Sequence, residues 1–247
     1  MTTSARHTRT ALVTGGSRGI GRAVAERLVA AGQDVAIVYA GNHDEAATTV
    51  KQLQAAGADP LAVQADIADE QALSSAFDAV EQRFGGVDVV VNAAGIMRLE
   101  PVAELDLDTF DALLRTNVRG HFLVAREAAR RLRDGGAFIG FSTSVTRLSL
   151  PTYGAYAATK GAVEAMIPIL AKELAGRDIT VNAVAPGPTA TELFLDGKSD
   201  EAIEQIAGNN PMGRLGAPED IAEVVAHLAG PARWINGQTV FVDGGAA

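Results

Sequence analysis

Several chemical resources are missing from this sequence, and each absence excludes a class of function. None of the 247 residues is cysteine, so disulfides, thiolate nucleophiles, iron–sulfur clusters and thiolate zinc sites are excluded. Aromatic residues make up only 5%, which argues against a ligand cage lined with rings. Positive charge is also scarce. The 21 Lys and Arg against 30 Asp and Glu give a net charge of −9, which disfavours nucleic acid as the main partner.

Long hydrophobic runs are absent as well. No stretch reaches the ~18–20 uninterrupted apolar residues of a membrane span, so no membrane association is expected. The segment Met1–Thr10 is polar, with Arg6 and Arg9, and does not resemble a signal peptide. These features predict a soluble, cytoplasmic protein. The histidines form no metal-binding pair, so no metal is expected; they are His7, His43, His121 and His227.

Apolar residues make up 47% of the chain, and they fall in short runs that alternate with longer helix-periodic segments. The short runs are typical of strands buried on both faces of a parallel sheet; they are Ala11–Val13, Val35–Tyr39, Leu61–Gln64, Val87–Asn92, Ala137–Phe141, Thr180–Ala185 and Thr239–Val242. The expected helices are Ile20–Ala31, Glu45–Ala56, Glu70–Phe84, Leu107–Arg133, Tyr153–Gly176 and Pro218–Leu228. This alternation predicts one doubly wound α/β domain of Rossmann type over residues 1–247, with a predominantly parallel seven-stranded sheet and helices on both faces.

One stretch, about Pro186–Ala217, departs from this alternation. Prolines and glycines there surround a short amphipathic piece. In this topology the stretch follows a strand, and loops at the carboxyl edge of a parallel sheet bind ligands. We interpret residues 188–215 as a substrate lid; an ordinary surface excursion is the alternative. Leu193–Leu195 would close over an apolar substrate or simply pack against the body.

A glycine-rich turn, Thr14–Gly21, follows the first expected strand and opens the first expected helix. Its glycines would give a tight turn, close backbone approach and close helix–strand packing, while amides at the helix start hold a pyrophosphate. The position between a strand and a helix favours a dinucleotide over a chance glycine pattern. The residues expected to bind it here are Gly15, Ser17, Arg18, Gly19, Ile20 and Gly21.

The choice of nucleotide rests on charge near the ribose. NAD sites usually place an acidic residue after the second strand. Here that strand ends with Tyr39, Ala40, Gly41 and Asn42, and the first acid, Asp44, comes late. Arg18 offers a fork of donors suited to a 2′-phosphate. The sequence therefore predicts NADPH/NADP+ rather than NADH, with Tyr39 and Asn42 beside the ribose; a solvated Arg18 and a permissive site are the alternative.

Two further strand ends suit a dinucleotide. Asp66 and Ile67 end the third strand, where a carboxylate can accept a hydrogen bond from the adenine amino group. The fourth strand ends with small residues that let the backbone approach the ribose; this segment is Asn92, Ala93, Ala94 and Gly95. Each is also compatible with ordinary strand-end chemistry.

Tyr156 and Lys160 are four residues apart, which places a phenol and an ammonium on one helix face. A free tyrosine has a pKa near ~10, too high for acid–base work at neutral pH. A nearby Lys160 cation and an oxidised nicotinamide would lower that pKa. Tyr156 could then donate a proton to a carbonyl oxygen or remove one from an alcohol.

These motifs together resemble the short-chain dehydrogenase/reductase family, in particular its 3-oxoacyl-carrier-protein reductase-like branch. The shared pattern, in order, is Thr14–Gly21, Asn92–Gly95, Asn117, Ser142–Ser144, Tyr156-x-x-x-Lys160, Asn182–Gly187 and the ending Trp234–Gly245. The resemblance covers essentially the whole chain. It implies NADPH-dependent, reversible reduction of a ketone or aldehyde to an alcohol by hydride transfer, with a small-molecule carbonyl substrate such as a 3-oxoacyl thioester, and a homo-oligomer, tetramer or dimer.

The resemblance also implies individual roles. Tyr156 would be the general acid, and Lys160 would hold the nicotinamide ribose. Asn117 would interrupt its helix locally and position a water in a proton relay. A serine hydroxyl would bind the carbonyl oxygen. The nicotinamide and phosphates would contact the segment after the sixth strand, through Pro186, Gly187, Thr189 and Thr191.

The carbonyl-binding hydroxyl departs from the family pattern. That serine usually lies thirteen residues before the tyrosine, which falls on Thr143 here. Ser144 lies twelve residues before and Ser142 fourteen before. We favour Ser144, because a β-branched Thr is stiffer and a serine just past the strand end can turn into the cleft. Thr143 and Ser142 stay open as alternatives.

Other residues are expected to have lesser roles. Tyr153 could contact substrate, and His121 would either pack or touch the relay. Trp234 is interpreted as core or subunit interface. Two rival functions are weighed: a Rossmann-type methyltransferase, which lacks its acid after the second strand, and a non-catalytic nucleotide-binding relative, which would not keep the complete chemical set.

Overall fold

The computed structural model describes residues 8–247. Their seven strands form one sheet, and every pairing between neighbouring strands is parallel. Residues 1–7, which include Arg6 and His7, lie outside the described residues. The strand order is β3-β2-β1-β4-β5-β6-β7, so the direction of winding reverses between β1 and β4. The doubly wound Rossmann-type prediction is confirmed.

The strands lie close to the predicted runs. The inner strands are mostly apolar and buried on both faces, whereas the two strands at the edges of the sheet are only partly buried. Their bounds are β1 Thr10–Thr14, β2 Asp34–Tyr39, β3 Leu61–Gln64, β4 Val87–Asn92, β5 Leu132–Phe141, β6 Thr180–Pro186 and β7 Thr239–Val242. Only β5 begins well before its expected start. Gly135 and Gly136 lie inside this strand, and its register with β4 shifts between Val87 and Val89.

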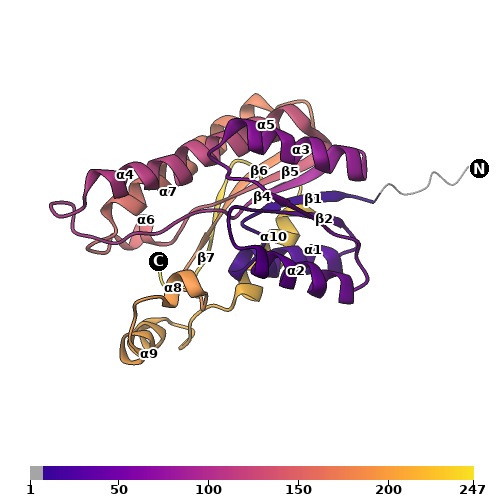
Figure 1. The fold of residues 1–247 in the computed structure, drawn as a ribbon. Coiled ribbons are helices and arrows are strands. Elements are labelled where there is room, and N and C mark those ends of the chain that lie inside the picture. Colours follow the sequence, from indigo (N-terminus) through magenta and orange to yellow (C-terminus); the bar gives the residue numbers. More distant parts are fainter. Residues whose placement is uncertain (1–7) are drawn as a thin grey trace, which may run out of the picture.

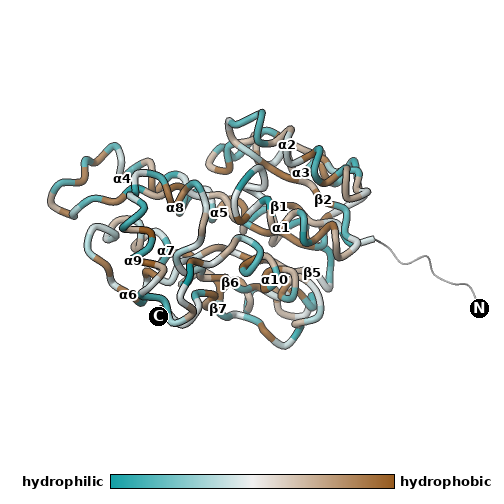
Figure 2. Tube along the Cα trace, turned by 90° about the horizontal axis from the view of Figure 1, so that it is seen from below, coloured by the Kyte–Doolittle hydropathy of each residue, from teal (hydrophilic) through white to brown (hydrophobic). Residues whose placement is uncertain are grey.

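Helices cover both faces of the sheet (Figure 1). On one face lie α3 (Glu70–Phe84), α5 (His121–Arg131) and α7 (Gly154–Glu173), and on the other α1 (Gly19–Ala30), α2 (His43–Ala55) and α10 (Pro218–Ala229). Alternate residues of one strand face the two layers. In β1, Leu12 packs with the first group, and Ala11 and Val13 pack with the second. Figure 2 shows that hydrophobic and hydrophilic stretches alternate along the helices.

The helix predicted over Leu107–Arg133 is wrong as a single unit. It is divided into α4 (Leu107–Leu113), a π-helical stretch η1 (Leu114–Gly120) and α5, and Leu132 already pairs with Val87 in the sheet. A π-helix inserts an extra residue per turn, which often marks a functional site. Asn117 lies in the middle of this stretch, as the family resemblance implies.

The segment expected to form a lid is more ordered than its prolines suggest. It contains α8 (Glu192–Leu195) and α9 (Asp200–Asn209), and an isolated bridge joins Thr189 to Gly216. Figure 1 shows both helices standing beyond the carboxyl ends of the strands. A short helix, α6 (Val145–Leu148), follows β5 on the same side. Among residues 8–247, no helix combines the length and apolarity needed to cross a membrane.

Candidate active site

A cavity of about 510 Å³ opens at the carboxyl ends of the strands, where the sheet reverses its winding. Its walls come from the glycine-rich turn, the ends of β2 to β6, the start of α7 and the segment around α8. All the predicted cofactor-binding and catalytic residues line it except Asn92 and Asn117. Its volume is within the ~300–1,000 Å³ typical of ligand sites.

The glycine-rich turn fits tightly against the fourth strand. Gly15 has φ +66°, and a Cβ there would lie 2.9 Å from the Ala94 backbone. A Cβ on Gly21 would lie 2.1 Å from the Gly15 carbonyl oxygen, so helix α1 can start at this turn only with glycine. The arrangement leaves the amides at the start of α1 facing the cavity, which is the geometry that binds a pyrophosphate.

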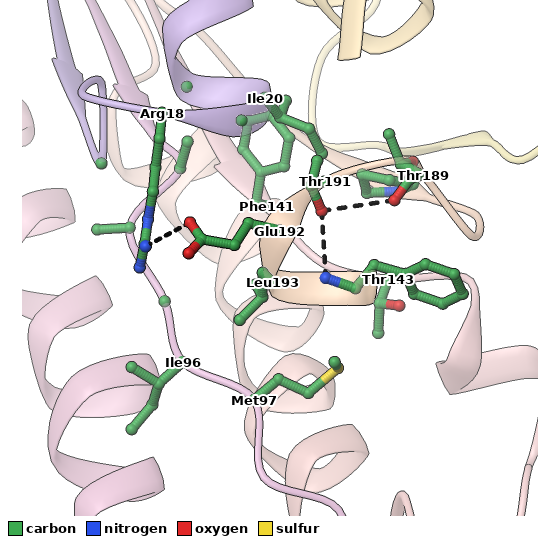
Figure 3. A pocket seen from close by; sticks show the side chains of 18 of the residues that line it. Arg18, Ile20, Ile96, Met97, Phe141, Thr143, Thr189, Thr191, Glu192 and Leu193 are labelled. Carbon is green, nitrogen blue, oxygen red and sulfur yellow. Dashed lines mark hydrogen bonds and ion pairs between the residues drawn. The ribbon is translucent and has the colours of Figure 1, made fainter. Parts of the chain in front are cut away.

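Arg18 does not point freely into solvent. Its guanidinium pairs with Glu192 of α8, at 2.7 Å, so a residue of the glycine turn and a residue of the expected lid meet across the cavity. Figure 3 shows the two side chains pointing toward each other. Nothing in the sequence indicated Glu192, because 174 residues separate it from Arg18. Arg18 thus lies at the end of the cavity predicted to hold the ribose, and the Glu192 carboxylate is paired with the guanidinium that is expected to bind the 2′-phosphate.

The other residues expected around the adenosine also line the cavity, but their side chains already have partners. The Tyr39 hydroxyl lies 3.0 Å from His43 Nδ1, and the Asn42 side chain caps α2 by accepting from the Glu45 amide. Asp66 accepts from the Ala68 amide and pairs with Arg115 at 2.8 Å. Arg115 was missed because it lies on an exposed helical face with no sequence motif.

Asn92 is buried and does not line the cavity, and its place among the cofactor-binding residues stays a prediction. The Thr14 hydroxyl donates to Asn92 Oδ1 at 2.5 Å, and Asn92 Nδ2 lies 2.8 Å from His121 Nδ1. The same Thr14 oxygen accepts from the Ala94 amide at 3.3 Å. Asn92 therefore joins β1, β4 and α5, and supports the turn at Ala94 from below.

His121 packs rather than titrates. Its ring makes an edge contact with Phe138, with centroids 5.7 Å apart, and the residue is buried. Burial, with the Lys160 charge as a second cause, lowers the pKa of His121 to about 3. The imidazole is therefore neutral at physiological pH, which matches the packing alternative and gives no support to a relay role.

Asn117 is held by the backbone of the loop after β4. Its Oδ1 accepts from the Ile96 amide at 2.9 Å, and its Nδ2 donates to the Ile96 carbonyl at 2.8 Å. A third contact, 3.1 Å long, reaches the hydroxyl of buried Thr159. The side chain thus fastens η1 to the cavity wall. A Cβ on Gly95 would lie 3.2 Å from Asn117 Oδ1 and 3.5 Å from Lys160 Nζ, so these groups meet behind Gly95.

Tyr156 and Lys160 lie together on α7 at the inner part of the cavity. Lys160 Nζ is 5.7 Å from the Tyr156 ring centroid and donates to the Phe141 carbonyl at 2.9 Å. Burial lowers the pKa of Lys160 to about 8. Burial and the neighbouring Tyr153 phenol raise the pKa of Tyr156 above its ordinary value. In the protein alone, desolvation therefore outweighs the lowering that was expected from Lys160.

The three hydroxyl residues after β5 all line the cavity, but they differ in their partners. Ser142 donates to Glu164 at 2.5 Å. Thr143 accepts a long bond of 3.4 Å from the Val145 amide. Within residues 8–247, the Ser144 hydroxyl has no hydrogen-bond partner, and its amide donates to the Pro186 carbonyl at 2.9 Å. Thr143 and Ser144 thus keep protons available for a bound carbonyl.

The cavity wall fits a dinucleotide along its length. The Gly15–Gly21 turn and Arg18 lie at one end and Lys160 and Tyr156 at the other, with small residues between them. On the far side, Thr191 caps α8 by accepting from the Phe194 amide (Figure 3). At the inner end, the Tyr156 phenol lies with the Lys160 ammonium, beside the hydroxyl groups of Thr143 and Ser144. These groups are suited to protonating a substrate oxygen that gains negative charge during the reaction.

Fold and site together define a dinucleotide-binding oxidoreductase of Rossmann type. A family model described as Enoyl-(Acyl carrier protein) reductase matches residues 15–247. NADPH-dependent aldehyde reductase 2, chloroplastic, of Arabidopsis thaliana is 44% identical, covering 96% of this chain and 93% of the plant protein. The chain belongs to the short-chain dehydrogenase/reductase family, which rules out the methyltransferase alternative.

Solved structures support the same assignment. A short-chain dehydrogenase/reductase from Serratia marcescens superposes with a TM-score of 0.92 at 38% identity, covering 98% of this chain and 99% of that one. A short chain dehydrogenase from Burkholderia cenocepacia in complex with NADP has a TM-score of 0.91 at 40% identity, covering 98% of this chain and 99% of that one.

Proposed function

We propose that this protein is an NADPH-dependent carbonyl reductase that converts an aldehyde or ketone to an alcohol, reversibly. The observation that carries the proposal is the placement of Tyr156 and Lys160 at the inner end of a cavity whose outer end holds Arg18. Bound NADPH supplies the hydride. The protein supplies the proton, the oxygen-binding donors and a site partly shielded from water.

The chemical roles follow from the positions of the side chains. Tyr156 donates its proton to the carbonyl oxygen; with a raised pKa it is protonated at neutral pH, as an acid for reduction must be. Lys160 binds the nicotinamide ribose, and Asn117 holds the wall behind it. A hydroxyl from Ser144, or alternatively Thr143, donates to the same carbonyl oxygen and stabilises the developing charge.

Cofactor recognition uses the outer end of the cavity. The amides of the glycine turn bind the pyrophosphate, and Arg18 binds the 2′-phosphate of NADPH. Two relatives agree with this choice: the Arabidopsis protein is described as an NADPH-dependent aldehyde reductase, and the Burkholderia structure is a complex with NADP. A cytoplasmic location stays a prediction, and the Arabidopsis relative is described as chloroplastic.

The substrate half of the cavity favours an uncharged carbonyl compound. Its walls are apolar or aromatic; they include Ile96, Met97, Leu148, Leu150, Tyr153 and Leu193. The charged residues that line the cavity are Arg18, Asp66, Lys160 and Glu192. Arg18 is paired with Glu192 and assigned to the 2′-phosphate, and Lys160 is assigned to the nicotinamide ribose, so neither cation is left for a charge on the substrate. A carboxylate or phosphate close to the reacting carbon would therefore lose its water without gaining a positive partner.

We expect neutral aromatic aldehydes to be reduced more efficiently than carboxylate analogues of the same shape. Benzaldehyde and 4-formylbenzamide should exceed 4-carboxybenzaldehyde in kcat/KM by about tenfold or more, since an unpaired charge costs at least ~1.4 kcal/mol on transfer to an apolar site. NADPH oxidation followed spectroscopically measures all three. The amide is the size control. Equal values for the amide and the carboxylate would contradict the apolar assignment, and no turnover with any carbonyl would contradict the proposed reaction.

We also propose that the chain forms a homo-oligomer. Trp234 is fully exposed at 100%, so the expectation that it belongs to the core is wrong and the subunit-interface alternative remains. Phe122 of α5 and Ile169 of α7 are also more than half exposed, on helices whose small residues allow close approach. Light scattering at micromolar concentration should give a dimer or tetramer mass; a monomer mass would exclude this.

A further inference from the structure

Glu164 of α7 gathers hydroxyl groups behind the predicted carbonyl-binding segment. The Ser142 hydroxyl donates to Glu164 Oε1 at 2.5 Å, and the Thr146 hydroxyl lies 2.9 Å from the same oxygen. Thr146 Oγ1 is also 2.9 Å from the Thr143 carbonyl. One carboxylate oxygen therefore joins both ends of the turn formed by residues 142–146 to helix α7.

The position of Glu164 along α7 links this turn to the acid–base pair. Tyr156, Lys160 and Glu164 follow one another at intervals of four residues, so they lie on one side of the helix. Glu164 is not among the residues that line the cavity, whereas Ser142, Thr143 and Ser144 are. Glu164 therefore contacts the turn that carries the hydroxyl groups, and not the cavity itself.

The hydrogen bonds between the Glu164 carboxylate and the hydroxyl groups of the turn favour one fixed orientation of the turn. An ionised carboxylate only accepts hydrogen bonds, and bonds to it are stronger than those between neutral groups. Glu164 forms no ion pair within the part of the chain that the structure describes, so hydroxyl groups are its partners. The proton of Ser142 is directed at Glu164, which leaves Thr143 and Ser144 as the donors toward the cavity.

We propose that Glu164 is a positioning residue that locks the 142–146 turn, so that a hydroxyl of this turn meets the substrate carbonyl beside Tyr156. The inference rests on the proposed reduction, because only then does the turn face a reacting oxygen. A misplacement of about 1 Å in such a donor can reduce the rate by ~10²-fold. Glu164 acts through the turn and contacts neither substrate nor cofactor.

The test compares Glu164→Ala and Glu164→Gln with Glu173→Ala, an exposed carboxylate on the same helix. We expect Glu164→Ala to lower kcat by about 10- to 100-fold with the NADPH Kd unchanged, by analogy with other positioning groups. Glu164→Gln, whose amide oxygen still accepts both hydroxyls, should stay within a few-fold of the wild type. The deuterium isotope effect from NADPH labelled at the transferred position should increase only in Glu164→Ala.

A second pair of measurements separates positioning from folding. Adding Ser142→Ala and Thr146→Val to Glu164→Ala should cause little further loss, since contacting residues that act as one unit are not additive. Amide hydrogen exchange at residues 144–148 should accelerate in Glu164→Ala and not in Glu173→Ala. Wild-type kcat in Glu164→Ala, or equal losses in Ala and Gln, would overturn the proposal. If the wild type reduces no carbonyl, the proposed reaction fails, and hydrogen exchange still decides whether Glu164 holds the turn.

Discussion

Replacing Tyr156 with Phe is expected to lower kcat for carbonyl reduction by about 10²–10⁴-fold, the usual contribution of a general acid. The phenylalanine ring keeps the volume of the side chain, so the cavity and its apolar walls are retained. The NADPH Kd should change little, because the phenol contributes only a small part of the cofactor contacts. The variant thus separates the proton donor from cofactor binding.

Tyr153→Phe is the matched control for this experiment. Tyr153 also lines the cavity, and its ring centroid is 6.5 Å from that of Tyr156, but it lies outside the Tyr-x-x-x-Lys motif. It should keep kcat within a few-fold. Single-turnover kinetics and NADPH fluorescence titration measure chemistry and binding separately. Unchanged turnover in Tyr156→Phe, with folding verified by circular dichroism, would overturn the mechanism.

Carbonyl reduction and alcohol oxidation should depend differently on pH, because they need opposite protonation states of Tyr156. Reduction needs the neutral phenol, and burial raises the pKa of Tyr156, so this group stays protonated and reduction should show no loss from its titration between about pH 6 and 8. Alcohol oxidation needs the phenolate, so its rate should rise with pH over the same range. A wild-type oxidation rate that falls as the pH rises would contradict Tyr156 as the base.

Replacing Arg18 with Ala is expected to weaken NADPH binding by about 10- to 100-fold, since hydrogen bonds to a charged group contribute ~1.5–3 kcal/mol. NADH binding should change only a few-fold, because NADH lacks the 2′-phosphate. The Glu192 carboxylate forms an ion pair with the Arg18 guanidinium at 2.7 Å, so the 2′-phosphate must displace this carboxylate. Glu192→Gln should therefore bind NADPH slightly more tightly, by no more than a few-fold, as expected for an exposed pair.

Arg27→Ala provides the control, because Arg27 forms a comparable pair, 2.6 Å to Glu223, away from the cavity. Fluorescence titration gives Kd for both cofactors in each variant, without a carbonyl substrate. Equal weakening of NADPH and NADH in Arg18→Ala, or tighter binding of NADH by the wild type, would show that Arg18 does not select the cofactor.

Local patterns were sufficient for most of the fold. Helix α3 and strands β3, β4 and β7 have the predicted bounds, because a short apolar run or a 3.6-residue periodicity can be recognised within consecutive residues. The boundary between α5 and β5 was missed: Leu132 and Arg133 continue the helical pattern, yet Leu132 pairs with Val87. Pairing between distant strands overrides local preference there.

The sequence alone determined the parts of the site that rest on motifs. The glycine turn was predicted from its position between a strand and a helix, and the four-residue spacing placed Tyr156 and Lys160 on one helix face, while their catalytic roles came from the family resemblance. The tertiary structure alone decided which groups meet across the chain: Glu192 with Arg18, and Glu164 with Ser142. It also decided the direction of the Tyr156 pKa shift, because burial depends on every segment that excludes water from the phenol.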